Sequence, residues 1–239
     1  MENWSTPFEV THWHAWSPAV QTRDAWLEWA KAPYSTNGEG SPAVEGMQPM
    51  NRRRLKQLGK MALDPTYRLP PTDSPIIFST QYGDLTRCYE LLKELTETGA
   101  ISPQSFGLSV HNAIPGLYTI DRKLHSNVTA LASTDGVMSA LIEALGFFAQ
   151  GESSARIIVV ENAVQQEYKN YCDFVDESYG FAMDVSPGGN LQFTLSSATT
   201  NNQTNPALPS NLNIFRFLIG EDKAFSEVIN NTLWKMRRV

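Results

Sequence analysis

The sequence predicts a three-layered α/β fold. Two short apolar runs, Pro75–Thr80 and Arg156–Val160, have the length and the residue types of buried strands. Residues 85–98 and 138–148, which lie between these runs, carry apolar side chains at helical spacing. Strands that alternate with helices along one chain are typical of an α/β domain.

Length and composition favour one domain over residues 1–239. The N-terminal residues and the few cysteines favour the cytoplasm. The hydrophobic fraction of 41% and the mean hydropathy of -0.30 are those of a folded protein. The net charge of -6 provides no basic field for nucleic acid, and no apolar run approaches the roughly 20 residues that span a bilayer. The N-terminal residues MENWSTPFEV lack the features of a secretory signal. With two cysteines and no C-x-x-C motif, we expect no disulfide framework, no metal site and no cofactor.

The first third of the chain predicts two short helices separated by a loop. Trp26 and Trp29 share one face of the first helix, which Thr22 can cap. Residues 33–49 are rich in proline and glycine and predict a loop. A second helix is expected over residues 52–63, and the prolines that begin at position 65 should end it.

The middle of the chain contains the clearest alternation of helices and strands. Asp84 can cap a helix over residues 85–98, and Gly99 can end it. A helix over residues 114–124 and a strand over residues 127–131 should follow before the helix that ends near Gly151. The inward face of the helix over residues 85–98 should carry Leu85, Cys88, Tyr89, Leu92 and Leu95.

The last quarter of the chain predicts a hairpin, a loop and a final helix. Phe181–Val185 and Leu191–Leu195 alternate in polarity, and a proline and two glycines separate them, which is typical of an antiparallel hairpin. Residues 199–211 are rich in threonine, asparagine and proline and predict a mobile loop. We expect the final helix over residues 222–236.

Three segments of the chain resemble a known family. They are FSTQYGDL at residues 78–85, SPQSFGLSVHNAIPGLYTI at 102–120 and LASTDGVMSALIEA at 131–144. Together they are similar to the β-ketoacyl synthase-like N-terminal domain, and in particular to short chain-length-factor-like subunits of aryl-polyene and related polyketide or fatty-acid systems. The resemblance covers residues 8–165. It implies a single truncated domain with mainly the N-terminal half of a thiolase-like fold, to which a C-terminal hairpin and helix are added.

The resemblance implies that this chain lacks the usual nucleophile. Active relatives place a cysteine in the turn between a buried strand and a long helix, where the helix N-terminus lowers the thiol pKa. Counting back from residues 140–144 puts that position at Thr134, with Ser133 as the one-residue alternative. A hydroxyl needs a strong neighbouring base, and none is visible nearby. We therefore expect Thr134 to fill the vacated position without reacting. The last histidine is His125, so the histidines of the relatives' second half have no counterpart.

The resemblance also implies a partner. We expect a heterodimer or higher heteromer with a full-length β-ketoacyl synthase, in which this chain is catalytically inactive and shapes the acyl tunnel of its partner. Acyl carrier protein would then be an indirect partner, and Arg52, Arg53 and Arg54 are candidates to contact it, although a solvated helix face is the simpler reading. Interface or tunnel residues are expected at His111, Asn112, Ala113, Gly116, Leu117 and Tyr118.

Several alternatives remain open from the sequence. The chain could be a stand-alone acyltransferase or hydrolase that uses Thr134 or Ser133, or a scaffold that binds carrier protein. His111 and Asn112 could act as base and oxyanion donor, but helix capping and an interface role are preferred because no nucleophile is paired with them. His12 and His14 lack a third metal ligand nearby in sequence, and Ser79 lacks the spacing of a nucleophile elbow.

Overall fold

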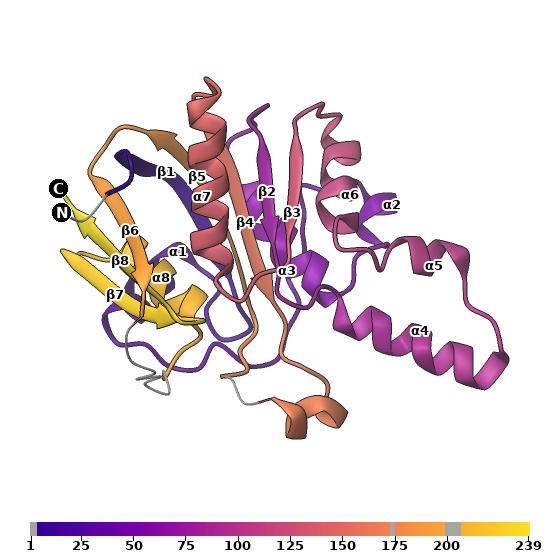
Figure 1. Cartoon of the computed structure of the whole chain (residues 1–239). Helices are drawn as coiled ribbons and strands as arrows, with labels where there is room; N and C mark the ends of the chain where they lie inside the picture. The colour runs from indigo at the N-terminus through magenta and orange to yellow at the C-terminus, as the bar shows by residue number, and fades with distance from the viewer. Residues whose placement is uncertain (1–3, 173–174, 199–206) are drawn as a thin grey trace.

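One mixed sheet organises the molecule (Figure 1). The computed structural model describes residues 4–172, 175–198 and 207–239, and the sheet of this part has eight strands in the order β3-β2-β4-β5-β1-β6-β8-β7. β2 is parallel to β3 and β4, whereas β5 is antiparallel to β4 and β1 is antiparallel to β5. The strands are β1 (Phe8–Trp16), β2 (Ile76–Ser79), β3 (Val128–Leu131), β4 (Ala155–Glu161), β5 (Tyr179–Pro187), β6 (Leu191–Ser197), β7 (Ala224–Ile229) and β8 (Thr232–Arg238).

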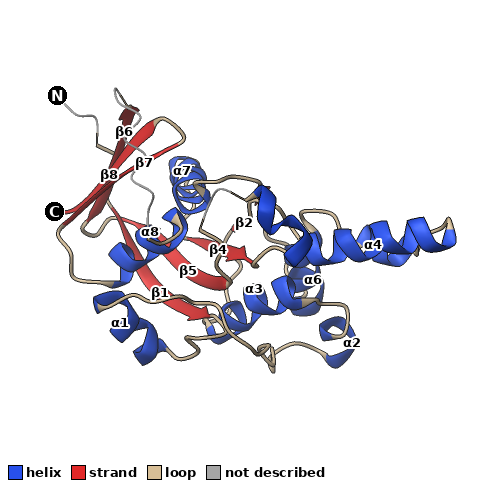
Figure 2. Ribbon diagram, turned by 90° about the horizontal axis from the view of Figure 1, so that it is seen from below, coloured by secondary structure: helices blue, strands red, loops and turns tan. Residues whose placement is uncertain are grey.

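Helices cover both faces of this sheet, and Figure 2 shows α7 and α3 on opposite sides of it. The helices are α1 (Arg23–Lys31), α2 (Pro49–Arg52), α3 (Gln57–Arg68), α4 (Leu85–Thr98), α5 (Pro103–Gly107), α6 (Ala113–Arg122), α7 (Gly136–Ala149), α8 (Ser210–Ile219) and the 3₁₀ helix η1 (Gln166–Tyr171). None of those in the described ranges has the length and apolarity required to cross a membrane.

The sheet divides the core into two layers because successive strand residues point to opposite faces. Ile77 and Ile157 belong to the layer beneath α7, which also holds the tryptophans of α1 and the aromatic residues of α8. Ile76 and Ile158 belong to the layer beneath α3 and α6. The three-layered α/β fold is therefore confirmed, with buried strands where the apolar runs predict them.

The predicted hairpin between residues 181 and 195 is wrong in its pairing. β5 and β6 lie where the sequence places strands, but β1 lies between them: Phe8 pairs with Pro187 on one side and with Leu191 on the other. β1 was not expected, because a register shift between Val10 and His12 breaks its alternation of polar and apolar residues.

The predicted final helix is also wrong. Its residues form β7 and β8, an antiparallel pair joined by Asn230 and Asn231, whose φ angles of 48° and 61° suit a tight hairpin turn. Trp234 and Met236 face the core from β8 at the two-residue spacing of a strand. The loop predicted over residues 199–211 lies partly outside the described residues, and its last two residues begin α8, a helix that the sequence analysis missed.

The predicted helix over residues 52–63 is divided. α2 ends at Arg52, Leu55 turns into the core, and α3 begins at Gln57 and continues beyond Pro65 to Arg68. A proline inside a helix has no amide hydrogen for the carbonyl four residues earlier, which here belongs to Met61. Gly180 of β5 lies against this carbonyl, so close that a Cβ at position 180 would be 2.2 Å from the Met61 oxygen.

The apolar face predicted for α4 is largely uncovered, which corrects the expectation that it points inward. α4 extends away from the body of the molecule, with α5 beside it (Figure 1). Leu92 and Leu95 are 55% and 44% exposed. Only the first turns of α4 are anchored: Arg87 bonds Asp84 at 3.3 Å, and its Nη2 donates to the Arg54 carbonyl at 2.8 Å. α4 and α5 are called the helical arm below.

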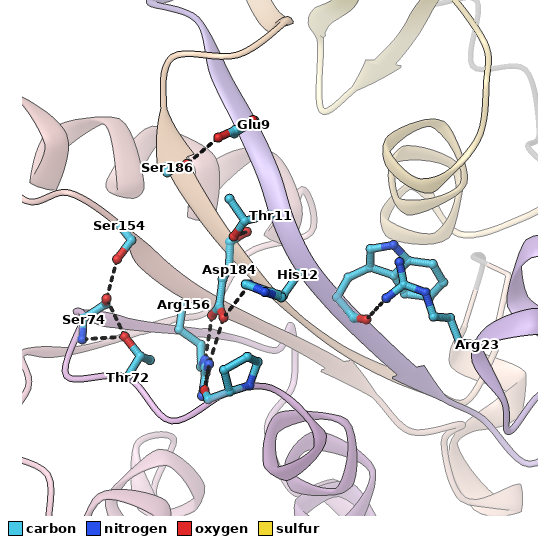
Figure 3. Close-up of polar contacts among 12 residues, drawn as sticks. Glu9, Thr11, His12, Arg23, Thr72, Ser74, Ser154, Arg156, Asp184 and Ser186 are labelled. Carbon is cyan, nitrogen blue, oxygen red and sulfur yellow. Dashed lines mark hydrogen bonds and ion pairs between the residues drawn. The ribbon is translucent and has the colours of Figure 1, made fainter.

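A buried arginine joins four segments of the α3 side of the sheet, and Figure 3 shows its ion pair with Asp184. Arg156 of β4 is fully buried and forms a bidentate ion pair with Asp184 of β5, at 2.7 and 2.9 Å. Its other donors reach the Tyr118 hydroxyl on α6 at 2.9 Å and the Pro70 carbonyl at 2.6 Å. Desolvation lowers the pKa of Arg156, but the carboxylate of Asp184 outweighs it, so that the net pKa is raised and the charge persists.

The contact between Gly180 and α3 predicts a sharp cost for one added methyl group. Gly180→Ala should lower the free energy of unfolding by about 1–3 kcal/mol or more, because the new Cβ meets a backbone oxygen that cannot rotate away. Gly146→Ala is the matched control: on exposed α7 surface with open space around it, it should raise stability by about 0.5–1 kcal/mol. Urea denaturation of both variants measures the difference, and equal stabilities would contradict the close approach.

Candidate functional site

The turn between β3 and α7 holds the two predicted hydroxyl residues, and each of them hydrogen-bonds another side chain. The Ser133 hydroxyl donates to Asp135, and Ser139 donates to the same carboxylate oxygen at 2.7 Å. The Thr134 hydroxyl contacts the side-chain amide of Asn230 in the β7–β8 turn. A carboxylate at a helix N-terminus is favourable on electrostatic grounds alone. The contacts of both hydroxyls are those of a structural turn, with no histidine or amine among them.

The side chain of Thr134 lies on the surface and not in a pocket. We expected its side chain to fill a vacated pocket, but Thr134 is exposed and reaches the tip of the β7–β8 hairpin. The reason is that the hairpin, which the sequence analysis took for a helix, brings Asn230 to this turn. Thr134 therefore joins two distant parts of the chain.

His111 fixes the beginning of α6 against the end of β3. Its Nε2 lies 2.9 Å from the Leu131 carbonyl, and because a carbonyl oxygen only accepts, Nε2 carries a proton. The ring also packs edge-on against Phe78 at 6.4 Å between centroids. Asn112 begins α6 through its carbonyl, which accepts from the Gly116 amide. The capping bond expected from its side chain is not formed.

The predicted interface residues divide between two faces of α6. Leu117 and Tyr118 face inward and belong to the core layer beneath α3 and α6, so their side chains serve this chain's own packing. The outer face carries Asn112, Ala113 and Gly116, and a Cβ at Gly116 would meet nothing within 4 Å. Ile120, one turn further along this face, is 66% exposed.

Apolar side chains are exposed on the elements at and beyond the β3 edge of the sheet, where Figure 1 shows α6, α5 and α4 following one another. Among the described strands, β3 pairs only with β2, and its other edge is free. This β3-side surface comprises Leu92, Leu95, Phe106, Val110, Ile120 and Val128. Exposed apolar patches of this kind are typical of protein–protein contacts.

The three adjacent arginines do not act as one face. Arg52 and Arg53 line a pocket together with Lys60 of α3, whereas Arg54 lies outside the pocket and offers its backbone carbonyl to Arg87. The division arises because the helix breaks after Arg52. Lys60 was expected on the same helix face as the arginines, and the pocket was not predicted because it forms where that helix is divided.

Glu161 is a polar residue at the carboxyl end of β4 that the sequence analysis did not single out. It accepts from the Gln81 amide at 2.6 Å and from the Thr80 hydroxyl at 3.3 Å. Burial raises its pKa to about 8, although these two hydrogen bonds oppose the shift. The available signal was an acidic residue placed directly after an apolar strand. Glu161 joins the end of β4 to the segment that leads into the helical arm.

The remaining candidates are separated in space. Ser79 is fully buried, its hydroxyl has no partner in the described part of the chain, and it lies against Gly136 at the start of α7. His12 approaches Asp184 at 3.7 Å. The pKa of His14 is lowered mainly by burial and secondly by the positive charge of Arg23. Within the described ranges, no three metal-ligating side chains gather. Burial also raises the pKa of the Cys88 thiol, which makes it less reactive.

The pKa of Glu161 predicts how stability depends on pH. Between its ordinary value of 4.5 and about 8, the folded chain binds more protons at this site than the unfolded chain. The free energy of unfolding should therefore fall as pH rises through this window and level off above it. Glu161→Gln keeps an oxygen for the Gln81 amide, carries no charge and should flatten the decline. Urea denaturation across the window measures it, with Glu97→Gln at an exposed position as control, and an unchanged slope would refute the assignment.

Comparisons with solved structures give the same fold. One chain of the complex described as ketosynthase ApeO with its chain length factor ApeC, from Xenorhabdus doucetiae, is 24% identical, with a TM-score of 0.84 over 98% of this chain and 100% of that one. The ishigamide ketosynthase/chain length factor gives 0.63 at 13% identity, over 83% and 69% of the two chains. AntDE:AntF, a type II ketosynthase with its acyl-carrier protein, gives 0.65 at 12% identity, over 84% and 72%.

A comparison with curated proteins finds no match. The family model for the β-ketoacyl synthase N-terminal domain, in contrast, matches residues 26–236. The match begins within α1 and ends within β8, so at its C-terminal end it extends well beyond residue 165, where the resemblance of the sequence motifs stops. The chain therefore belongs to the β-ketoacyl synthase N-terminal domain family, and its fold is thiolase-like.

Proposed function

We propose that this chain is a non-catalytic subunit, similar to a chain length factor, that pairs with a full-length β-ketoacyl synthase and shapes its acyl tunnel. The pathway class is aryl-polyene, polyketide or fatty-acid biosynthesis. The observation that carries the proposal is the turn before α7. It presents Ser133 and Thr134, hydrogen-bonded to Asp135 and Asn230, where active relatives present a cysteine.

The chemistry of condensation explains why this turn matters. The acyl group must first be transferred to a nucleophile, and a cysteine at a helix N-terminus is suited to this because much of it is ionised near neutral pH. A hydroxyl ionises far less readily and needs a base to remove its proton. Ser133 already donates to the Asp135 carboxylate, which also accepts from Ser139, so these three side chains bind one another at the start of α7. Cys88, on α4, has its pKa raised by burial.

The comparisons support a partner. A chain of nearly the same length, covered completely by this one, occurs in a complex described as a ketosynthase with its chain length factor. The other two similar structures are also described as ketosynthase complexes, one with a chain length factor and one with an acyl-carrier protein. A short ketosynthase-like chain that works within a heteromer is consistent with all three.

The free edge of β3 suits a cross-subunit contact. In a parallel strand, the amide and carbonyl of one residue point to the same side, and the sides alternate along the strand. The carbonyls of Asn127 and Leu131 bond β2, so the amides of Val128 and Ala130 point away from it. An edge with free amides is a template for pairing with another chain. We assign this edge, the outer face of α6 and the helical arm to the synthase partner.

The small residues on α6 provide room at this surface. Ala113 and Gly116 let a partner backbone, or the wall of its tunnel, approach closely. Leu117 and Tyr118 support them from behind by fixing α6 to the sheet. Carrier protein is reached through the synthase, and of the three arginines expected to contact it, Arg52 and Arg53, which line one pocket, are the proposed contact.

The direct test of inactivity uses the purified chain with malonyl- and acyl-loaded carrier protein. We expect no carbon–carbon bond formation and no covalent acyl adduct by mass spectrometry. In the co-expressed complex, Thr134→Ala should leave synthesis nearly unchanged because the hydroxyl has no chemical role. Loss of synthesis in a correctly assembled Thr134→Ala complex, or an acyl adduct on Thr134 or Ser133, would instead identify this chain as an acyltransferase.

A bulky residue at the outer face of α6 should separate folding from assembly. Gly116→Trp places an indole where a Cβ meets open space, so the chain should still fold. In the complex, the indole should collide with the partner, and we expect dissociation in gel filtration or a shortened product. Gly146→Trp, an equally open helical position on α7, is the control and should change neither. If Gly116→Trp behaves like this control, the interface lies elsewhere.

A further inference from the structure

A cationic pocket lies between α2, α3 and the loop that precedes them. Its volume is about 370 Å³, within the range of small-ligand sites. The turn before α7 contributes no residue to this pocket. The pocket is lined by Ser41, Pro42, Ala43, Arg52, Arg53, Leu55 and Lys60.

The pocket is held in shape by bonds across it. Arg52 Nη1 donates to the Ala43 carbonyl at 3.5 Å, and Gln57 Nε2 donates to the Gly40 carbonyl at 2.9 Å. Both bonds tie the loop to the helices. Pro42 and Leu55 are buried and form an apolar floor. The site therefore combines an apolar base with a polar, positively charged rim.

The positive charge of the rim is not neutralised. No carboxylate of the described residues lies within 4 Å of Arg52, Arg53 or Lys60, although Lys56 next to them pairs with Glu90 at 2.9 Å. The chain as a whole carries a net charge of -6, so three clustered and unpaired cations stand out against it. Such a cluster attracts an anionic ligand.

We propose that this pocket binds a phosphate or phosphodiester joined to a short aliphatic chain, the chemistry that the prosthetic arm of a carrier protein shares with coenzyme A. The inference rests on the proposed function and deepens it by replacing the arginine run with a defined site. Two guanidinium groups and an ammonium group suit phosphate oxygens, and the apolar floor suits the aliphatic segment beside them. An acidic protein surface would need only a flat cationic patch, without a floor.

The position of the pocket agrees with this ligand. The residues that lead into and form α2 are bonded to α6 through Asp121, which accepts from the Gln48 amide at 3.1 Å and from Asn51 Nδ2 at 2.8 Å. Figures 1 and 2 show α2 beside α6, whose outer face we assign to the synthase partner. A flexible arm whose phosphate is held here would start next to that partner.

The test compares carrier protein with and without its prosthetic arm. The double variant Arg53→Gln/Lys60→Gln is prepared in the complex with the synthase, and the control Lys169→Gln/Lys223→Gln removes the same charge from exposed lysines elsewhere. Binding of arm-bearing carrier, arm-free carrier, coenzyme A and inorganic phosphate is measured at one ionic strength. We expect the pocket variant to bind arm-bearing carrier and coenzyme A about 10- to 100-fold more weakly than the control variant does.

Each outcome decides between explanations. An unchanged affinity for arm-free carrier supports the pocket as a phosphate site, and coenzyme A binding without carrier binding would assign the free coenzyme as the source. Equal losses for both forms of carrier would overturn the proposal in favour of an acidic protein surface, as would no loss at all. Assembly with the synthase is followed separately by gel filtration, and coenzyme A binding is also measured on the chain alone. A failure of the proposed heterodimer is thus distinguishable from a failure of the pocket.

Discussion

The bidentate ion pair between Arg156 and Asp184 fixes the geometry on which the proposed interface depends. A guanidinium without contact with water is tolerated only when its charge and its hydrogen bonds are all satisfied. Here the carboxylate pairs the charge, and together with the Tyr118 hydroxyl and the Pro70 carbonyl it gives each of the three guanidinium nitrogens a partner. The buried charge therefore ties α6 and the segment at Pro70 to two central strands that are already paired through their backbones. The outer face of α6 is presented by a helix that cannot shift without exposing that charge.

The helices differ in how far their apolar faces are buried, and this difference separates the core from the side of the molecule that carries the helical arm. α3, α6, α7 and α8 bury their apolar faces within the chain. The helical arm does not: beyond its anchor at Arg87, Leu92 and Leu95 remain open to solvent. Packing within the chain accounts for the first group of helices. The second has an apolar surface that the described residues leave uncovered, which suits the contact proposed above.

Local patterns predicted much of the fold, and long-range contacts account for the rest. The apolar runs of β2 and β4 and the helical spacing of α7 are properties of a few neighbouring residues, so they could be read directly. The insertion of β1 between β5 and β6 could not, because pairing partners leave no local trace and a bulge disguised the strand.

The same limit applies to the candidate site. The absence of a cysteine at the turn before α7 was evident from the sequence. That Asn230 reaches Thr134 and that Leu117 faces inward both depend on how separate elements meet. The asparagine pair at positions 230 and 231 was a legible hairpin signal that the helical interpretation overlooked.

The place of β1 in the sheet has a consequence for biosynthesis. Phe8 of β1 pairs with Pro187 and Leu191, which are synthesised long after it. During translation, Phe8, Trp13 and Trp16 must wait without their neighbours, and chains with such non-local pairing fold slowly. Until β5 and β6 have been synthesised, the apolar side chains of β1 lack their neighbouring strands and can be bound by chaperones.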